Sequence, residues 1–254
     1  MGKIPKIIHQ TWNDEEDNLS EFFVGLINKW KLSNPDFEHR YYSESDRLSF
    51  IKENFEEKVY RAYCRIIPGA YKADLWRYCI LYNYGGFYVD IDTLAIGSLK
   101  PLLEKDSHLI TLIDFNRNVL EGNHNLANGF IGVTSGSEIM LRCIDNIVEY
   151  VDTNKIPTSK LDFSGPGNLG RSVNVYLGNK ETESFVGKEG FQNEKGIYFL
   201  KFEENTENVY DIYNQENIIF QNKNGNQELA LQYEDECKKG SVKSWLSFQP
   251  FRMM

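Results

Sequence analysis

Hydrophobic and polar positions follow strand and helix periods in turn along the first part of the chain. Residues 6–11 and 37–42 have the short apolar pattern of strands, and residues 20–32 have the spacing of an amphipathic helix. A capping-box pattern at residues 43–46 opens a helix in a segment that reaches about Tyr63. Strands that alternate with helices predict an α/β sheet.

The segment at residues 71–93 is the most informative part of this pattern. Residues 71–83 contain neither Pro nor Gly and predict a helix, which the pair Gly85 and Gly86 ends. Residues 87–92 alternate with period two and predict a strand. On this strand one face would carry Phe87, Val89 and Ile91, and the other would carry Tyr88, Asp90 and Asp92.

The rest of the chain predicts further strands and helices, with a looser pattern after Asp152. The expected strands are residues 108–113, 129–133, 197–202 and 217–221. The expected helices are residues 168–177 and a helix to about Val151 that follows a capping box at residues 135–138. Polar tracts at residues 203–208 and 222–227 predict surface turns.

Asp90 and Asp92 place two carboxylates on one face of a strand end. They repel each other unless a cation or a donor lies between them, so the pair indicates a hard divalent ion such as Mg²⁺ or Mn²⁺. Such an ion takes one or two protein carboxylates and completes its shell with water and substrate phosphate oxygens. A solvated loop is the ordinary alternative for an isolated Asp-X-Asp.

Asp74 and Arg77 lie at positions i and i+3 and therefore share one face of the preceding helix. The carboxylate accepts from hydroxyls, and the guanidinium donates to phosphate or carboxylate. A surface ion pair of little energetic value is the alternative. The presence of both acidic and basic groups in one helix-turn-strand unit favours a site for a sugar diphosphate and a metal ion.

Composition is that of one globular domain. The chain has 254 residues, of which 41% are hydrophobic and 14% aromatic, enough to bury a substantial core. The net charge of −9 and the absence of a Lys/Arg cluster argue against a nucleic-acid partner. The four cysteines form no Cys-X-X-Cys pair and are expected to be reduced thiols.

The distribution of apolar residues predicts a cytoplasmic protein. The chain enters its first strand without the apolar run of a signal peptide, and no stretch approaches the ~20 apolar residues of a transmembrane helix. Peripheral association with the inner face of a membrane is compatible with this composition.

The segment at residues 71–93 resembles the glycosyltransferases with an Asp-X-Asp sugar-binding region. This family 32-like group contains yeast-type initiating mannosyltransferases and bacterial capsule or lipopolysaccharide transferases, and clostridial glucosylating toxins share its core. Four further stretches carry the resemblance, namely residues 4–12 (IPKIIHQTW), 128–133 (NGFIGV), 164–167 (SGPG) and 244–245 (SW).

The resemblance implies a single GT-A-like domain with a Rossmann-like mixed central sheet flanked by helices. Residues 1–133 would form the half that binds the nucleotide sugar, and residues 134–254 the acceptor side with a closing C-terminal segment. It also implies a metal-dependent transferase that retains the anomeric configuration. The donor would be a nucleotide sugar, with a UDP-hexose favoured over GDP-mannose, and the acceptor a glycan or lipid-linked saccharide in polysaccharide biosynthesis.

The resemblance also implies roles for residues around the donor sugar. Trp12 would stack on the nucleotide base, with Thr11 beside it. Asp74 and Arg77 would hold the sugar and its phosphate, and Asn128 would approach the sugar. We therefore expect Asp74, Arg77 and Asn128 to form the catalytic group.

A second set of implied roles concerns the diphosphate and the Mn²⁺ or Mg²⁺ ion. Tyr88 would hydrogen-bond near the diphosphate or ribose. Asp90 would contact the ribose or metal-bound water, and Asp92 would bind the metal directly. Ser244 and Trp245 would close over the diphosphate from a C-terminal segment.

The chain departs from the family in one respect. Many relatives carry a His a few residues before the closing Ser-Trp, and this chain has none there. The third protein contact to the metal is therefore open among Asp235, Glu236, Ser241 and Ser244.

Two other functions are alternatives. The Asp-X-Asp after an apolar strand is similar to that of haloacid-dehalogenase-type phosphohydrolases, but Leu94 stands where those motifs have Thr or Val. A nucleotide-sugar-binding module without turnover is the alternative outside enzymes. Phosphate release from monoesters would favour the first, and donor binding without transfer or hydrolysis the second.

Overall fold

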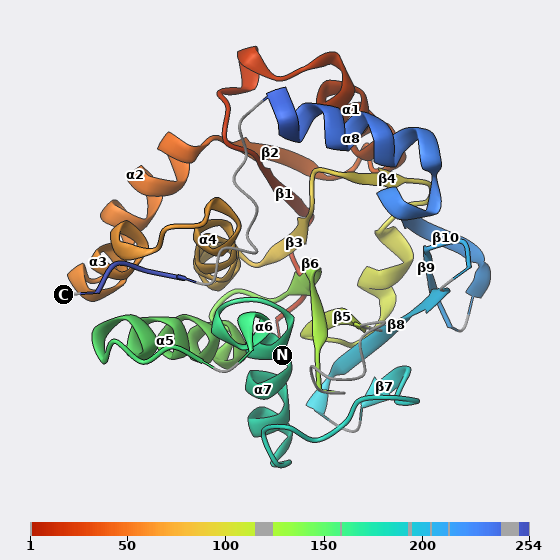
Figure 1. The fold of residues 1–254 in the computed structure, drawn as a ribbon. Helices are drawn as coiled ribbons and strands as arrows, with labels where there is room; N and C mark the ends of the chain where they lie inside the picture. Colours follow the sequence, from red (N-terminus) through yellow and green to blue (C-terminus); the bar gives the residue numbers. More distant parts are fainter. Residues whose placement is uncertain are drawn as a thin grey trace.

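The structure is a computed structural model of the chain, and it describes residues 2–114, 124–157, 159–192, 195–203, 205–212, 214–239 and 249–253. In this part of the chain a curled mixed β-sheet lies between helices (Figure 1). The expected α/β class, with a mixed central sheet flanked by helices, is confirmed. The division at residue 133 into two functional halves stays a prediction.

The sheet joins segments that lie far apart in the sequence. Its strands lie in the order β2, β1, β3, β6, β5, β8, β9, β10 and β4, and β7 pairs with β8. The pairs β1–β2, β1–β3 and β5–β8 are parallel, and the other pairs are antiparallel. The strands are β1 (Ile7–Thr11), β2 (Glu38–Tyr42), β3 (Gly86–Val89), β4 (Thr93–Ala95), β5 (Leu109–Ile113), β6 (Leu126–Val133), β7 (Gly190–Gln192), β8 (Ile197–Glu203), β9 (Asn208–Asp211) and β10 (Asn214–Asn222).

Helices supply the apolar layers on both sides of the sheet. The α-helices are α1 (Glu21–Ser33), α2 (Glu44–Asn54), α3 (Glu57–Arg65), α4 (Gly69–Tyr84), α5 (Glu138–Asp152), α6 (Lys160–Phe163), α7 (Pro166–Leu177) and α8 (Gln227–Lys239). Short 3₁₀ turns are η1 (Glu16–Asn18), η2 (Lys100–Glu104) and η5 (Lys223–Gly225). One apolar core includes residues of α3, α4, α5 and α7, and a second core includes Trp30 of α1.

The alternation in β3 divides its side chains between these two cores. Phe87 and Val89 are fully buried in the core that contains Trp30, whereas Tyr88 is buried in the core that contains α4. Period-two alternation produces this division because successive side chains of a strand point to opposite faces. The predicted faces of this strand are therefore confirmed for the residues up to Val89.

The prediction that this strand reaches Asp92 is wrong. β3 ends at Val89, and a turn follows in which the backbone N–H of Thr93 donates to the Asp90 carbonyl at 3.3 Å. The Thr93 hydroxyl donates to the same carbonyl at 2.7 Å. The Asp90 N–H still donates to the Gly129 carbonyl of β6 at 2.8 Å, but these turn bonds take residues 91 and 92 out of the ladder before β4 begins.

Two predictions about helix starts have opposite outcomes. Ser43 and Asp46 form the predicted capping box at the start of α2, but α2 ends at Asn54 because Phe55 is extended, and α3 is a separate helix. The second capping box is wrong, because Ser137 precedes α5 without a side-chain cap hydrogen bond. There the N–H of Gly136 instead donates to the Tyr82 carbonyl of α4 at 2.7 Å.

Three elements near the end of the sheet were not predicted. These are β4, β9 and α8, and α8 begins inside a polar tract for which the sequence predicted a turn. Among the described residues, no helix is long and apolar enough to cross a membrane.

His9 makes the fold sensitive to acid. It is fully buried in β1, its Nε2 lies 3.0 Å from the Gly85 carbonyl, and burial lowers its pKa from 6.5 to about 4. The unfolded chain therefore binds a proton between these two pKa values that the folded chain does not bind. Stability from this residue is present above pH 6.5 and is lost as the pH falls, by about 3 kcal/mol at full protonation.

We expect His9→Gln to reduce the acid sensitivity of folding, because glutamine keeps a donor for Gly85 without a titrating ring. Between about pH 7 and about pH 4.5, the free energy of unfolding of the variant should fall by about 2 kcal/mol less than that of the unaltered chain. Urea unfolding at both pH values measures this difference. Equal losses in the two proteins would show that another group dominates.

Candidate functional site

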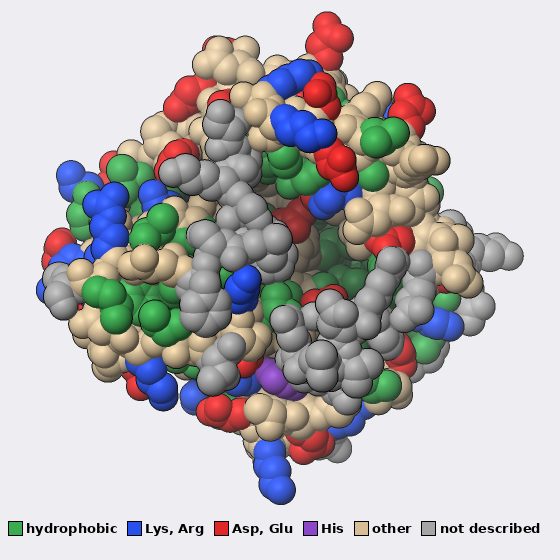
Figure 2. Space-filling model, in the orientation of Figure 1, with side chains coloured by type: hydrophobic (Ala, Val, Ile, Leu, Met, Phe, Trp, Pro, Cys, Tyr) green, Lys and Arg blue, Asp and Glu red, His purple; other side chains and the backbone are tan. Residues whose placement is uncertain are grey.

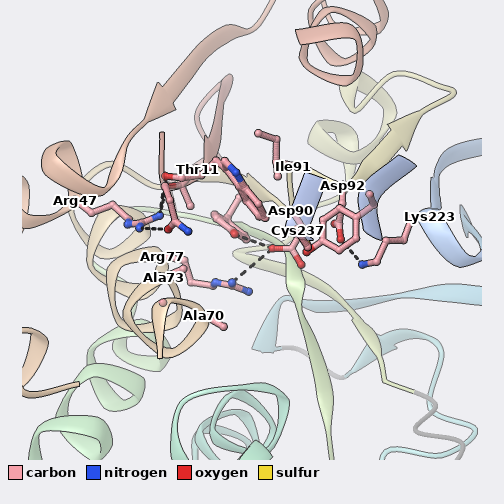
Figure 3. Close-up of a pocket in the computed structure, with 15 residues that line it drawn as sticks. Thr11, Arg47, Ala70, Ala73, Arg77, Asp90, Ile91, Asp92, Lys223 and Cys237 are labelled. Atoms are coloured by element: carbon pink, nitrogen blue, oxygen red, sulfur yellow. Dashed lines mark hydrogen bonds and ion pairs between the residues drawn. The ribbon is translucent and has the colours of Figure 1, made fainter. Parts of the chain in front are cut away.

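A pocket of about 510 Å³ lies at the carboxyl ends of β1 and β3. We call it the main pocket, and Figure 2 shows the hollow in this face of the molecule. Figure 3 shows its lining side chains, which come from both ends of the chain. They are Thr11, Trp12, Asn13, Arg47, Gly69, Ala70, Ala73, Arg77, Tyr88, Asp90, Ile91, Asp92, Lys223, Tyr233 and Cys237.

A buried ion pair on α4 lies at the inner wall of this pocket. Arg77 Nη2 is 3.1 Å from Asp74 Oδ1, and the exposed fractions of the two side chains are 7% and 10%. The surface alternative for this pair therefore does not hold. Asp74 also accepts from Asn128 Nδ2 at 2.8 Å and from the Ser164 hydroxyl at 2.7 Å. Burial raises the pKa of Asp74, and Arg77 and these donors oppose that rise.

Arg77 connects α4 to the two strands beside it. Its Nη1 donates to the Asn128 carbonyl at 2.6 Å, and its Nη2 is 3.5 Å from Asp90 Oδ1. The guanidinium carbon lies 4.3 Å from the centre of the Tyr88 ring. Three of the expected residues, Arg77, Asn128 and Asp90, are thus brought together.

Tyr88 supports Asp90 by a hydrogen bond. The Tyr88 hydroxyl donates to Asp90 Oδ1 at 2.7 Å, and burial raises the pKa of this phenol well above its usual value, so it stays a donor. Gly129 of β6 leaves room for the other oxygen, because a Cβ there would collide with Asp90 Oδ2. The Asp90 side chain is 39% exposed, so part of the carboxylate faces the pocket.

Asp92 lies deeper and is paired with a lysine. Its side chain is 11% exposed, and it forms a close ion pair with Lys223 of η5 (Figure 3). Burial lowers the pKa of the Lys223 ammonium, but the adjacent Asp92 carboxylate outweighs burial and raises it, so the lysine is charged. A cation thus already faces Asp92.

The two carboxylates fit a Mg²⁺ or Mn²⁺ ion. Asp90 and Asp92 supply hard oxygen donors at one edge of the main pocket. The Lys223 ammonium beside Asp92 occupies a position where a metal cation could bind. Among the described residues, no group of three or more His, Cys, Asp or Glu side chains could hold a metal ion. The described protein ligands would therefore be these two carboxylates, and substrate oxygens and water would complete the shell.

Thr11 and Trp12 form the opposite end of the main pocket. The Trp12 ring lies 4.7 Å from that of Phe23 and 6.0 Å from that of Tyr233, centre to centre. Arg47 holds this end in place, because its Nη1 donates to the Thr11 hydroxyl at 2.7 Å and to the Trp12 carbonyl at 3.1 Å. Thr11 and Trp12 are therefore placed in the pocket as expected.

Sequence reasoning missed Arg47, Lys223, Tyr233 and Cys237 as pocket residues. The spacing of Leu229, Tyr233 and Cys237 is that of one helical face, so the α8 residues had a signal in the sequence. The lysine had no such local signal.

Two of the four candidates for a third metal contact lie outside the lining of the main pocket. Asp235 and Glu236 pair with Lys239 and do not line the main pocket. Ser241 and Ser244 lie outside the described residues, as does Trp245.

A second pocket of about 240 Å³ adjoins the first. Its lining is largely polar and consists of Asp90, Asp92, Asp114, Ala127, Asn128, Gly129, Pro166, Asn222, Lys223 and Asn224. Asp90, Asp92 and Lys223 line both pockets, so they mark the junction. Pro166, the first residue of α7, lines this second pocket.

We expect Asp74→Ala to destabilise the fold by about 3 to 5 kcal/mol, because it leaves the buried Arg77 guanidinium without its nearest carboxylate. Asp74→Asn is the matched control, since it keeps an oxygen for Asn128 and should cost less. Urea unfolding measures both. Equal stability of Asp74→Ala and the unaltered chain would contradict this role.

We expect Gly129→Ala to weaken Mn²⁺ binding about 10- to 100-fold, because the added methyl displaces the Asp90 carboxylate. Gly132→Ala in the same strand is the contrast, since its methyl would meet the Phe87 ring in the core and should lower stability instead. Electron paramagnetic resonance measures bound Mn²⁺, and urea unfolding measures stability. Unchanged Mn²⁺ affinity in Gly129→Ala would contradict the placement of Asp90.

Comparison with known proteins identifies relatives. Residues 20–109 match the family described as "Glycosyltransferase sugar-binding region containing DXD motif". The chain is 34% identical to inositol phosphoceramide mannosyltransferase 1 of Schizosaccharomyces pombe over 43% of this chain and 34% of the relative. It is 35% identical to the initiation-specific alpha-1,6-mannosyltransferase of Candida albicans over 39% of this chain and 26% of the relative.

A solved structure shares the fold. The PaToxG glycosyltransferase aligns with a TM-score of 0.55 and 18% identity over 69% of this chain and 70% of that one.

The chain spans only about a third of the first of the two curated relatives named above and about a quarter of the second. Asp90, Ile91 and Asp92 supply an Asp-X-Asp sequence within the matched region, so residues 20–109 of this chain are similar to the glycosyltransferase sugar-binding regions that contain this motif.

Proposed function

We propose that the protein is a metal-dependent, retaining glycosyltransferase that moves a hexose from a nucleoside diphosphate sugar to a saccharide acceptor. The observation that carries this proposal is the junction of the two pockets. The main pocket has an aromatic end, and the second pocket is lined by amide and acid groups. Their shared lining consists of Asp90, Asp92 and Lys223. A nucleotide sugar has the same order of parts, namely a flat base, a charged diphosphate and a polar sugar.

The main pocket suits the nucleoside. Trp12 offers an aromatic face for the base, and its position is supported by Phe23 and Tyr233. The exposed part of the Asp90 carboxylate is an acceptor for ribose hydroxyls. The diphosphate would then lie at the junction, beside Arg77 and Lys223.

Departure of the nucleoside diphosphate is the step that needs the most charge stabilisation. A divalent ion held by Asp92 and Asp90 would neutralise negative charge on the leaving group. Arg77 is preorganised for the same task, because Asp74, Asn128 and Asp90 fix its guanidinium before substrate binds.

The environment of Asp74 supports transfer on one face of the sugar without a covalent intermediate. Both of its oxygens are engaged, Oδ1 by Asn128 and Arg77 and Oδ2 by Ser164. A carboxylate held in this way orients neighbours and is a poor nucleophile. The acceptor hydroxyl would attack beside the departing phosphate, which retains the anomeric configuration.

The names of the relatives bear on the donor sugar. Both curated relatives described above are named mannosyltransferases, which supports mannose and puts GDP-mannose ahead of the UDP-hexoses favoured by the sequence. The second pocket, with Asn128, Asn222 and Asp114, would receive the sugar and the glycan or lipid-linked acceptor. The cytoplasmic site of action, at or near the inner membrane face, belongs to the same proposal.

We expect nucleoside diphosphate release from one donor in a panel of GDP-mannose, UDP-glucose and UDP-galactose, with Mn²⁺ or Mg²⁺ present and not with a chelator. Asp92→Asn should lower this rate about 100-fold or more, because the carboxylate that binds the metal loses its charge. Asp235→Asn removes the same charge from α8, outside the lining of either pocket, and is the matched control.

Two results would contradict the proposal. Phosphate release from simple monoesters, without nucleoside diphosphate release, would favour a phosphohydrolase. Donor binding without transfer or hydrolysis, with a range of saccharide acceptors added, would favour a binding module.

A further inference from the structure

Lys223 lies opposite Asp92 because of the register of the sheet. β10 and β4 are antiparallel, and Asn222 pairs with Thr93 while Gln221 pairs with Leu94. One further step along this ladder leads from Thr93 to Asp92 and from Asn222 to Lys223. The pairing of β10 with β4 therefore places Lys223 beside Asp92.

The backbone around Lys223 is anchored on both sides. The N–H of Asn222 donates to the Glu207 carbonyl at 3.1 Å, and the Gln221 amide donates to the Thr206 carbonyl at 2.8 Å. Gly225 packs so closely on Thr206 that a side chain there would collide with its carbonyl. Only the flexible four-carbon side chain of the lysine is then free to move its charge.

The ammonium differs from the other cations of the main pocket. Arg47 is bound to Thr11, Trp12 and Asn13, and Arg77 is bound within the buried network of α4. Lys223 instead binds Asp92, the carboxylate expected to bind the metal, and its Nζ lies 4.2 Å from the centre of the Tyr233 ring. Its side chain is 28% exposed, so solvent and ligands can reach it.

Two cations cannot occupy the same carboxylate without repulsion. A divalent ion on Asp92 would therefore displace the lysine ammonium. The displaced group would still lie at the junction of the pockets, where the proposed function puts the donor's diphosphate.

We propose that Lys223 and the divalent cation are alternative partners of Asp92, and that the displaced lysine then binds the diphosphate of the donor. This inference rests on the proposed function. In the empty site Lys223 neutralises a buried carboxylate that would otherwise be unpaired. In the loaded site the Lys223 ammonium pairs with the phosphate oxygens instead. Lys223 therefore opposes metal binding and favours nucleotide binding.

Substitution of the lysine should change these two affinities in opposite directions. Lys223→Met should tighten Mn²⁺ binding to the nucleotide-free protein about tenfold, because it removes the competing charge, and should weaken GDP or UDP binding in saturating Mn²⁺ about tenfold. Electron paramagnetic resonance measures the first affinity, and calorimetry the second. Lys239→Met removes one charge from an exposed pair on α8 and should change neither affinity.

The results separate this inference from simple structural damage and from the proposed function. Lys223→Arg keeps the charge and should restore nucleotide binding with weak Mn²⁺ affinity. Weaker or unchanged Mn²⁺ binding in a folded Lys223→Met would overturn the inference, even if the donor panel succeeds. Tighter Mn²⁺ binding in that variant, with a donor panel that fails, would uphold the competition and overturn the transfer reaction alone.

Discussion

The buried pair of Asp74 and Arg77 is the interaction on which the site depends. From one turn of α4 it reaches the Asn128 backbone and side chain on β6, the Asp90 carboxylate after β3, and the Ser164 hydroxyl before α7. Hydrogen bonds and charge pairing from neighbouring segments offset the cost of burying this ion pair. The four segments are therefore positioned by one network, and a change in any of them alters the orientation of Arg77 in the pocket.

Much of the fold was predictable where the pattern is local. β1, α1 and α4 lie within two residues of their expected bounds because periodicity and helix stops act over a few residues. The end of β3 was not predicted, because the period-two pattern runs on to Asp92 while hydrogen bonds from Thr93 to the Asp90 carbonyl close a turn there. α8 was missed because its apolar face, Leu229, Tyr233 and Cys237, is narrow, most of its other positions are polar, and Leu231 breaks the pattern by facing solvent.

The site shows the same division between local and tertiary information. One pocket is lined by residues to which the family resemblance gave roles around the donor, namely Thr11, Trp12, Arg77, Tyr88, Asp90 and Asp92. Asp74 does not line this pocket but pairs with Arg77, which does, and Asn128 lines the adjoining second pocket. The partner of Asp92 comes from a residue more than a hundred positions away, and only the pairing of β10 with β4 brings it there. No pattern around residue 223 contains that information.

The short turn at residues 90–92 connects two distant places in the sheet. β3 is third in the strand order and β4 is last, and Figure 1 shows β4 leading from the end of β3 toward β10. Asp90 is tied to α4 through Arg77, whereas Asp92 is tied to η5 through Lys223. The two carboxylates of one short turn are therefore held by side chains from two different parts of the fold. A shift of β10 relative to α4 would therefore change how these two carboxylates are oriented toward each other.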